Sequence, residues 1–105
     1  MPNFLLAYTG NPTMPATEEE GATVTAAWGA WMGRVGEALR DPGNPTGGAK
    51  TVGTDGSVRD GGAGGITGYS IVSAVDMDSA LALAKDCPHL ASGGDVEVYE
   101  TFDVM

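Results

Sequence analysis

Cys87 and His89 are the side chains best suited to chemistry, as the only cysteine and the only histidine of the chain. Imidazole exchanges protons near neutral pH, so His89 is the natural general base, and Asp76, Asp86 or Asp95 could orient its ring. Alternatively, His89 follows a predicted helix, where it would cap backbone carbonyls and, when protonated, interact favourably with the helix dipole. We favour this structural role and keep His89 as the one candidate catalytic residue.

Cys87 could act as a nucleophile only if its thiolate were stabilised. The neighbouring Asp86 and the end of the predicted helix would instead oppose a negative charge. We therefore predict a buried packing cysteine. A metal site would need ligands beyond Cys87 and His89, and the chain has no second cysteine or histidine to supply them, so we expect no metal.

Two glycine-rich segments raise the question of a nucleotide cofactor. Residues 43–51 resemble a phosphate-binding loop, but Ala49 stands where that motif needs lysine. Residues 62–67 lack the final glycine of a dinucleotide-binding fingerprint and precede a predicted strand when they should follow one. We interpret both segments as mobile loops and expect no cofactor.

Aromatic side chains are the best candidates for a ligand pocket, because they offer flat apolar walls with polar tips. The residues expected to shape this pocket are Tyr8, Trp28, Trp31 and Tyr69, with Tyr99 as a further aromatic. Ordinary packing in the core is the alternative role, and the two roles are compatible if the core is incompletely filled.

The elements that would position these side chains begin with a short apolar strand, Asn3–Tyr8. Thr17 and Glu20 form a capping-box pattern that predicts a helix start. The apolar stripe of this helix continues to Leu39, and Pro42 ends it. Its members are Val24, Ala27, Trp28, Trp31, Met32, Val35 and Leu39.

Three strands and a second helix follow. We predict strands over Ala49–Gly53, Ile66–Ala74 and Asp95–Phe102, with a turn at Asp55-Gly56 after the first of them. Asp76 would cap the second helix, and Pro88 would end it. The apolar stripe of that helix is Met77, Ala80, Leu81, Ala84 and Cys87.

The resulting order, βαββαβ, predicts a single α+β domain over residues 1–105 with a ferredoxin-like, four-stranded antiparallel sheet. Right-handed crossovers would place both helices on one face and make the first and third strands central. These two strands are also apolar on both sides, so the second sheet face needs a cover. A homodimer that stacks sheet on sheet is the simplest cover, and the long glycine-rich loop is the alternative.

The C-terminal half resembles the YCII-related (DGPF) family. The matching stretches are Gly68–Val72, Ala80–Lys85, Cys87–Leu90 and Gly93–Val98, and the resemblance extends over nearly the whole chain. It implies a dimeric α/β barrel, in which two ferredoxin-like protomers face each other through their sheets. It also implies a cavity between sheet and helices or near the dimer interface.

Some members of this family are proposed hydrolases with a His-Asp pair near the cavity, and the chain departs from them there. Trp28 occupies the position in the first helix where relatives often carry histidine. The Asp-Gly-Pro-Phe segment is present only as Asp60-Gly61-Gly62-Ala63. The resemblance therefore leaves open whether this chain is an enzyme.

The net charge of the chain argues against one class of binding partner. The chain has 14 acidic and 5 basic residues, for a formal net charge of -9, which would repel nucleic acid. The apolar run Phe4–Ala7 is too short for a signal-peptide core or a membrane span, so we expect a cytoplasmic protein.

Two hypotheses about function stay open. In the first, a cavity binds a small organic molecule. In the second, the chain is a non-catalytic interaction or regulatory module that uses the loop from Gly43 to Gly65 or the acidic surface.

Overall fold

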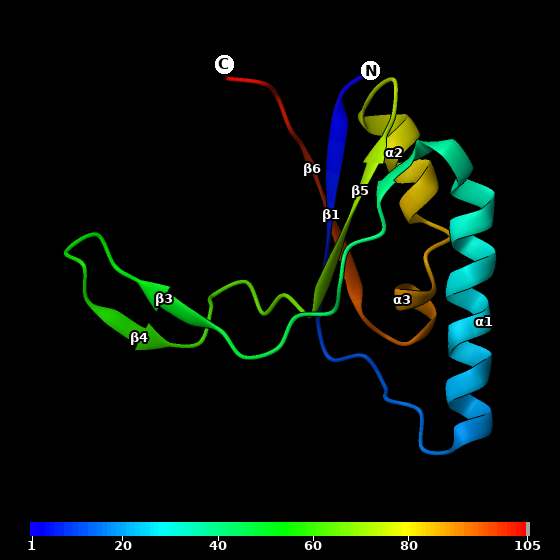
Figure 1. Ribbon diagram of the computed structural model, residues 1–105, viewed down its shortest axis with the longest axis horizontal. Helices are drawn as coiled ribbons and strands as arrows, with labels where there is room; N and C mark the ends of the chain where they lie inside the picture. The colour runs from blue at the N-terminus through cyan, green and yellow to red at the C-terminus, as the bar shows by residue number, and fades with distance from the viewer. Residues whose placement is uncertain (105) are drawn as a thin grey trace.

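Three helices lie against one face of a four-stranded antiparallel sheet, and a two-stranded hairpin extends from the other side (Figure 1). The computed structural model describes residues 1–104. In chain order the elements are β1 (Asn3–Thr9), α1 (Glu18–Val35), the 3-10 turn η1 (Gly36–Ala38), β2 (Leu39–Asp41), β3 (Lys50–Val52), β4 (Val58–Asp60), β5 (Gly68–Ser73), α2 (Met77–Ala84), α3 (Pro88–Ala91) and β6 (Asp95–Glu100).

The sheet has the order β2-β5-β1-β6. Strand β1 pairs antiparallel with β5 on one side and with β6 on the other, so β1 and β5 are central. These are the two strands that were predicted to be central because they are apolar on both faces. The α+β, ferredoxin-like arrangement predicted from the sequence is therefore confirmed.

The second strand of this sheet was placed wrongly. The edge strand beside β5 is β2, in which Leu39 pairs with Val72 and Asp41 with Ile71, and not the predicted segment Ala49–Gly53. The reason is an early helix end. Helix α1 stops at Val35, because Gly36 caps it with a φ of 60°, a backbone conformation that favours glycine.

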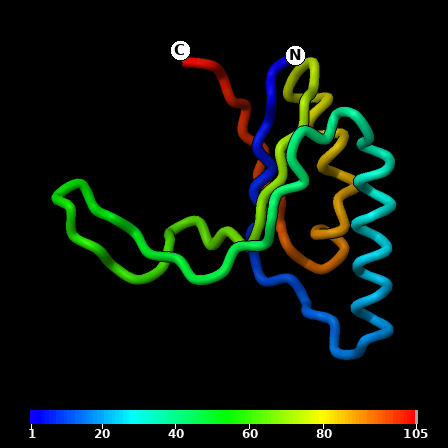
Figure 2. Tube along the Cα trace, viewed as in Figure 1, coloured from blue at the N-terminus to red at the C-terminus, as the bar shows by residue number. Residues whose placement is uncertain are grey.

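The predicted strand at Ala49–Gly53 corresponds to β3, which pairs only with β4 in a separate hairpin. The predicted turn at Asp55-Gly56 is confirmed: Gly53 N donates to Ser57 O at 2.7 Å, and Gly56 has a φ of 85°. This hairpin points away from the sheet and does not fold over its open face (Figure 2). The glycine-rich loop is therefore not the cover of that face.

Both helix caps predicted from the sequence are present. Thr17 Oγ1 accepts from Glu20 N at 3.1 Å, and Asp76 Oδ1 accepts from Ser79 N at 2.8 Å. The end of the second helix differs from the prediction. Helix α2 stops at Ala84, and Pro88 begins the short helix α3, because a proline at the first helical position sacrifices no hydrogen bond.

The core lies between the sheet and the helices. Phe4, Leu6 and Tyr8 point from β1 into it, together with Val72 from β5 and Trp31 from α1. The opposite sheet face carries the alternate residues Leu5 and Ile71, which are only partly buried, and Tyr99, which is 50% exposed. Within residues 1–104, no helix is both long enough and apolar enough to cross a membrane.

Candidate functional site

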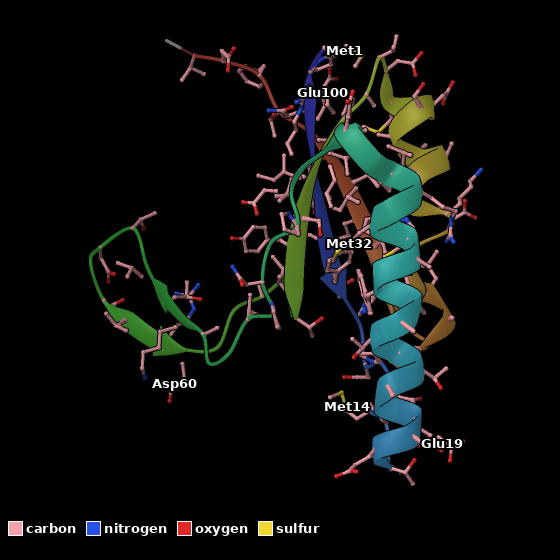
Figure 3. The ribbon with its side chains drawn as sticks, turned by 45° about the vertical axis from the view of Figure 1, so that its right-hand side comes forward. Met1, Met14, Glu19, Met32, Asp60 and Glu100 are labelled. Carbon is pink, nitrogen blue, oxygen red and sulfur yellow. The ribbon has the colours of Figure 1, made fainter. Side chains whose placement is uncertain are left out.

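A cavity of about 310 Å³ opens where β1 ends and β5 begins, beside the middle of α1. Its walls come from five parts of the chain that are distant in sequence. The lining residues are Tyr8, Trp28, Met32, Pro42, Gly43, Asn44, Pro45, Thr67, Gly68, Tyr69 and His89. Figure 3 shows Met32 on the side of α1 that faces the sheet, whereas Asp60 lies on the hairpin, away from the helices.

Three of the four predicted pocket residues, Tyr8, Trp28 and Tyr69, line this cavity. The Tyr8 and Trp28 ring centroids are 5.3 Å apart with an interplanar angle of 73°, an edge-on contact. Trp31 does not line the cavity. It lies behind Trp28, is only 1% exposed, and donates from Nε1 to Leu83 O at 3.0 Å. Trp31 is thus a core residue.

The segment Pro42–Pro45 forms the outer wall of the cavity. Asp41 Oδ1 accepts from Gly43 N at 2.8 Å, which bends the chain just after β2. Gly43 has a φ of 73°, and a Cβ atom there would lie 1.6 Å from Tyr69 O. Only glycine therefore allows this wall to pass so close to β5.

A chain of two hydrogen bonds joins the cavity wall to the core. Ser70 Oγ lies 2.7 Å from Pro42 O, and Tyr8 Oη lies 2.7 Å from Ser70 Oγ. A carbonyl oxygen only accepts, so Ser70 donates to Pro42 and Tyr8 donates to Ser70. Burial raises the pKa of Tyr8 far above its ordinary value. The Tyr8 phenol is therefore neutral and is no general base.

His89 is 6% exposed and belongs to α3, and its Nε2 lies 2.7 Å from Thr9 O. Our prediction that His89 caps the carbonyls of the second helix was wrong, because the ring reaches across to the end of β1. Among the hydrogen bonds of residues 1–104, none joins His89 to Asp76, Asp86 or Asp95. The orienting group is a backbone carbonyl and not a carboxylate.

Cys87 is 2% exposed, and burial raises the pKa of its thiol. A neutral, buried thiol is a packing residue and a poor nucleophile, as predicted. Within the described part of the chain, no group of three or more His, Cys, Asp or Glu side chains could hold a metal ion.

Sequence reasoning missed two parts of the site. The loop at residues 42–45 was interpreted as a helix end and the start of a mobile loop, although its two prolines and its glycine are typical of a rigid, closely packed turn. Thr67 and Gly68 were assigned to the start of a strand, and Thr67 also to a mobile loop. Gly68 lies against Pro45 and the Tyr8 ring, and this close approach was not visible in the sequence.

Neither a protein-family model nor a curated protein sequence matches the chain. Among solved structures, the chain is similar to 5-chloro-2-hydroxyhydroquinone dehydrochlorinase (TftG) from Burkholderia phenoliruptrix, in its complex with 2,5-dihydroxybenzoquinone. The two share 22% sequence identity over 96% of this chain and 93% of that one, with a TM-score of 0.56. This likeness shows a common fold.

Proposed function

We propose that the cavity beside Tyr8, Trp28 and Tyr69 binds a small, planar, uncharged organic molecule. The observation that carries the proposal is the lining, which includes the aromatic residues Tyr8, Trp28 and Tyr69 and no Asp, Glu, Lys or Arg around about 310 Å³. Ligand cavities in proteins measure about 300 to 1,000 Å³ and are mostly apolar with a few polar groups. A cavity at the lower end of this range suits a single substituted ring.

The absence of charge in the lining favours an uncharged ligand. An anion would find no lysine or arginine among the lining residues, and a cation would find no carboxylate. Placing an unpaired charge in a largely apolar cavity is costly, because it loses hydration without compensation. We therefore rank neutral rings above their charged analogues.

The structural neighbour supports the planar-ring part of this proposal. The dehydrochlorinase was solved in complex with 2,5-dihydroxybenzoquinone, a planar ring, and it has the same fold as this chain. We also propose, from the matching stretches in the C-terminal half, that the chain is related to YCII-related proteins. A cytoplasmic location stays a prediction.

The chain offers few groups for turnover of a bound ligand. Burial keeps the Tyr8 phenol and the Cys87 thiol neutral, since it raises the pKa of both. His89 is then the one side chain of the lining suited to acid–base chemistry near neutral pH. We propose binding as the function and His89 as the residue through which any proton transfer would pass.

A thermal-shift screen tests the proposal, with hydroquinone and resorcinol as neutral rings and benzoate and benzylamine as charged analogues. A ligand at 100 times its dissociation constant stabilises the folded state by about 2.7 kcal/mol, so a neutral ring should raise the melting temperature clearly. Stabilisation by benzoate or benzylamine alone would contradict the proposal, as would no stabilisation by any ring.

A matched pair of tyrosines localises the binding. Tyr69 and Tyr99 both belong to strands of the main sheet, but only Tyr69 lines the cavity. Tyr69→Ala should weaken the binding of a neutral ring about tenfold, because an aromatic wall is lost, whereas Tyr99→Ala should leave it unchanged. Equal effects of the two substitutions, measured by calorimetry, would place the ligand elsewhere.

We further propose that a second copy of the chain covers the open sheet face. All helices of the described chain lie on the other side, and the hairpin points away (Figure 1). Leu5 and Ile71 are only partly buried on this face, and Tyr99 is half exposed. Two such faces would bury each other in a C2 dimer.

Analytical ultracentrifugation at micromolar concentration tests the dimer. Ile71→Lys should give a folded monomer, since it places a charge in the centre of the proposed interface. Val75→Lys is the control, because Val75 is 69% exposed in the loop after β5. A wild-type chain that sediments as a monomer would rule out the dimer.

The β3–β4 hairpin supports a second candidate function as an interaction module. Val52 and Val58 face each other across the two strands and are 68% and 62% exposed, so the hairpin carries an apolar pair far from the core. Exposed apolar pairs of this kind suit a protein contact. Cross-linking from the hairpin in a native lysate should yield a defined partner that a Val52→Thr, Val58→Thr variant loses, and self-association alone would count against this role.

A further inference from the structure

The hydrogen bond at His89 determines which of its ring nitrogens carries the proton. Nε2 lies 2.7 Å from the backbone carbonyl oxygen of Thr9, and a carbonyl oxygen only accepts. Nε2 must therefore be the protonated nitrogen. In the neutral ring this leaves Nδ1 with a lone pair and no hydrogen, so Nδ1 is an acceptor.

The packing at Gly94 holds the ring in this position. A Cβ atom on residue 94 would lie 2.1 Å from Nε2 and 2.6 Å from Cε1 of His89. Glycine is therefore required at this point for the ring to reach Thr9. The ring is fixed on one edge by Gly94 and at its tip by Thr9.

Nδ1 is left without a partner in the protein. Among the described residues, no hydrogen bond involves this atom. Ser73 Oγ is the one buried side-chain nitrogen or oxygen atom of the described chain that lacks a hydrogen bond. The unbonded Nδ1 is thus not sealed in the interior, and His89 is part of the cavity lining.

The donors near His89 are already used within the protein. Tyr8 donates to Ser70, and Ser70 donates to the carbonyl of Pro42. Thr67 Oγ1 donates to Tyr8 O at 3.2 Å. Of the lining hydroxyls, those of Tyr8 and Thr67 are therefore committed, and Nδ1 of His89 stays free to accept.

We propose that His89 Nδ1 selects ligands that carry a hydrogen-bond donor, such as a phenolic or enolic hydroxyl, with Thr9 and Gly94 as positioning residues that fix the tautomer. The inference rests on the proposed ligand cavity and defines which planar rings it accepts. A ring that carries only hydrogen-bond acceptors would bring its lone pairs close to the lone pair of Nδ1, or it would bury Nδ1 without a hydrogen bond. Either arrangement weakens binding.

Calorimetry with three rings at about pH 8, above the range in which imidazoles usually titrate, tests this selection. Hydroquinone carries donors, whereas the smaller 1,4-difluorobenzene and the larger 1,4-dimethoxybenzene do not, so the two controls bracket it in size. Hydroquinone should bind about tenfold more tightly than either control. Equal binding of all three would overturn donor selection and leave the cavity proposal standing, whereas binding of none would overturn both.

Nuclear magnetic resonance tests the tautomer directly, because the chain has a single histidine and its ring signals need no sorting. A long-range proton–nitrogen spectrum should show Nε2 protonated and Nδ1 unprotonated in the free protein. Hydroquinone should shift the Nδ1 resonance, and 1,4-difluorobenzene should not. A protonated Nδ1 in the neutral ring would overturn the proposal.

His89→Phe keeps a flat ring but removes the acceptor. This variant should bind hydroquinone as weakly as it binds 1,4-difluorobenzene, with its fold checked by circular dichroism. A variant that kept the hydroquinone preference would overturn the role of His89. If His89→Phe does not fold, the wild-type ligand series and the ring-nitrogen spectrum still decide the question.

Discussion

The hydroxyl of Tyr8 donates a 2.7 Å hydrogen bond to Oγ of Ser70, a residue 62 positions later in the chain. Ser70 Oγ in turn donates a hydrogen bond to the carbonyl oxygen of Pro42, also at 2.7 Å. The central strands β1 and β5 are thereby tied to the loop that forms the outer wall of the cavity. Core and candidate site are parts of one hydrogen-bonded unit.

Tyr8→Phe should remove the first of these bonds and keep the ring that lines the cavity. We expect a loss of about 1 kcal/mol in the free energy of unfolding, measured by urea denaturation, with little change in ligand affinity. Tyr99→Phe is the control, since Tyr99 is 50% exposed and its hydroxyl bonds only to Glu97 on the surface. An effect at Tyr8 no larger than at Tyr99 would show that the buried bond contributes nothing.

Alkaline pH should destabilise the fold through Tyr8 and Cys87. Burial raises the pKa of both groups in the folded chain, so they stay protonated there while the unfolded chain ionises at about pH 10 and 8.5. The contribution of the two groups to the free energy of unfolding is complete below these pH values. It is lost as pH rises above them, by at most about 1.4 kcal/mol per pH unit for each group. Urea midpoints measured between neutral and alkaline pH should fall, and Tyr8→Phe should make the fall shallower. A pH-independent midpoint would contradict this.

The two tryptophans should separate stability from binding. Trp31→Phe removes the bond to Leu83 O and leaves space in the core, so we expect a loss of about 1 to 3 kcal/mol in unfolding free energy with ligand affinity maintained. Trp28→Phe changes a partly exposed cavity wall, so its main effect should be on affinity. Denaturation and calorimetry measure the two effects. A loss of affinity in Trp31→Phe and a loss of stability in Trp28→Phe would show that Trp31, not Trp28, shapes the site.

Gly43→Ala should displace the cavity wall. Its Cβ would collide with Tyr69 O in a backbone conformation that favours glycine, so both stability and ligand affinity should fall. Gly47→Ala lies in the same loop with no atom within 4 Å of the added Cβ and serves as the matched control. Two variants with the same affinity as the wild type would show that the loop does not shape the site.

Gly29→Ala should stabilise the protein. Gly29 is exposed in the interior of α1, and a Cβ there meets nothing within 4 Å. Alanine in a helix interior is better than glycine by about 0.8 to 1 kcal/mol, which thermal unfolding can resolve. Gly36→Ala should destabilise instead, because the helix cap at residue 36 has a φ of 60°. Similar melting temperatures for the two variants would contradict the assigned helix end.

The alternation and capping patterns of the sequence were enough for the main architecture. Apolar residues on both faces of β1 and β5 identified the central strands, since strands inside a sheet favour that pattern and edge strands alternate with polar residues. Thr17 and Asp76 identified the helix starts, because a side-chain cap is a local interaction. The aromatic composition identified three of the cavity walls.

Tertiary structure decided the rest. By its apolar spacing, helix α1 could have continued past Gly36. The cap at Gly36 ends it, and only the pairing of Leu39 with Val72 shows where the edge strand lies. Trp28 and Trp31 are equivalent in the sequence pattern, but packing buries one behind the other. His89 looked like a helix cap because sequence reveals local partners, whereas its actual partner, Thr9, is 80 residues away. Long-range contacts of this kind depend on how the layers stack, and no local pattern encodes them.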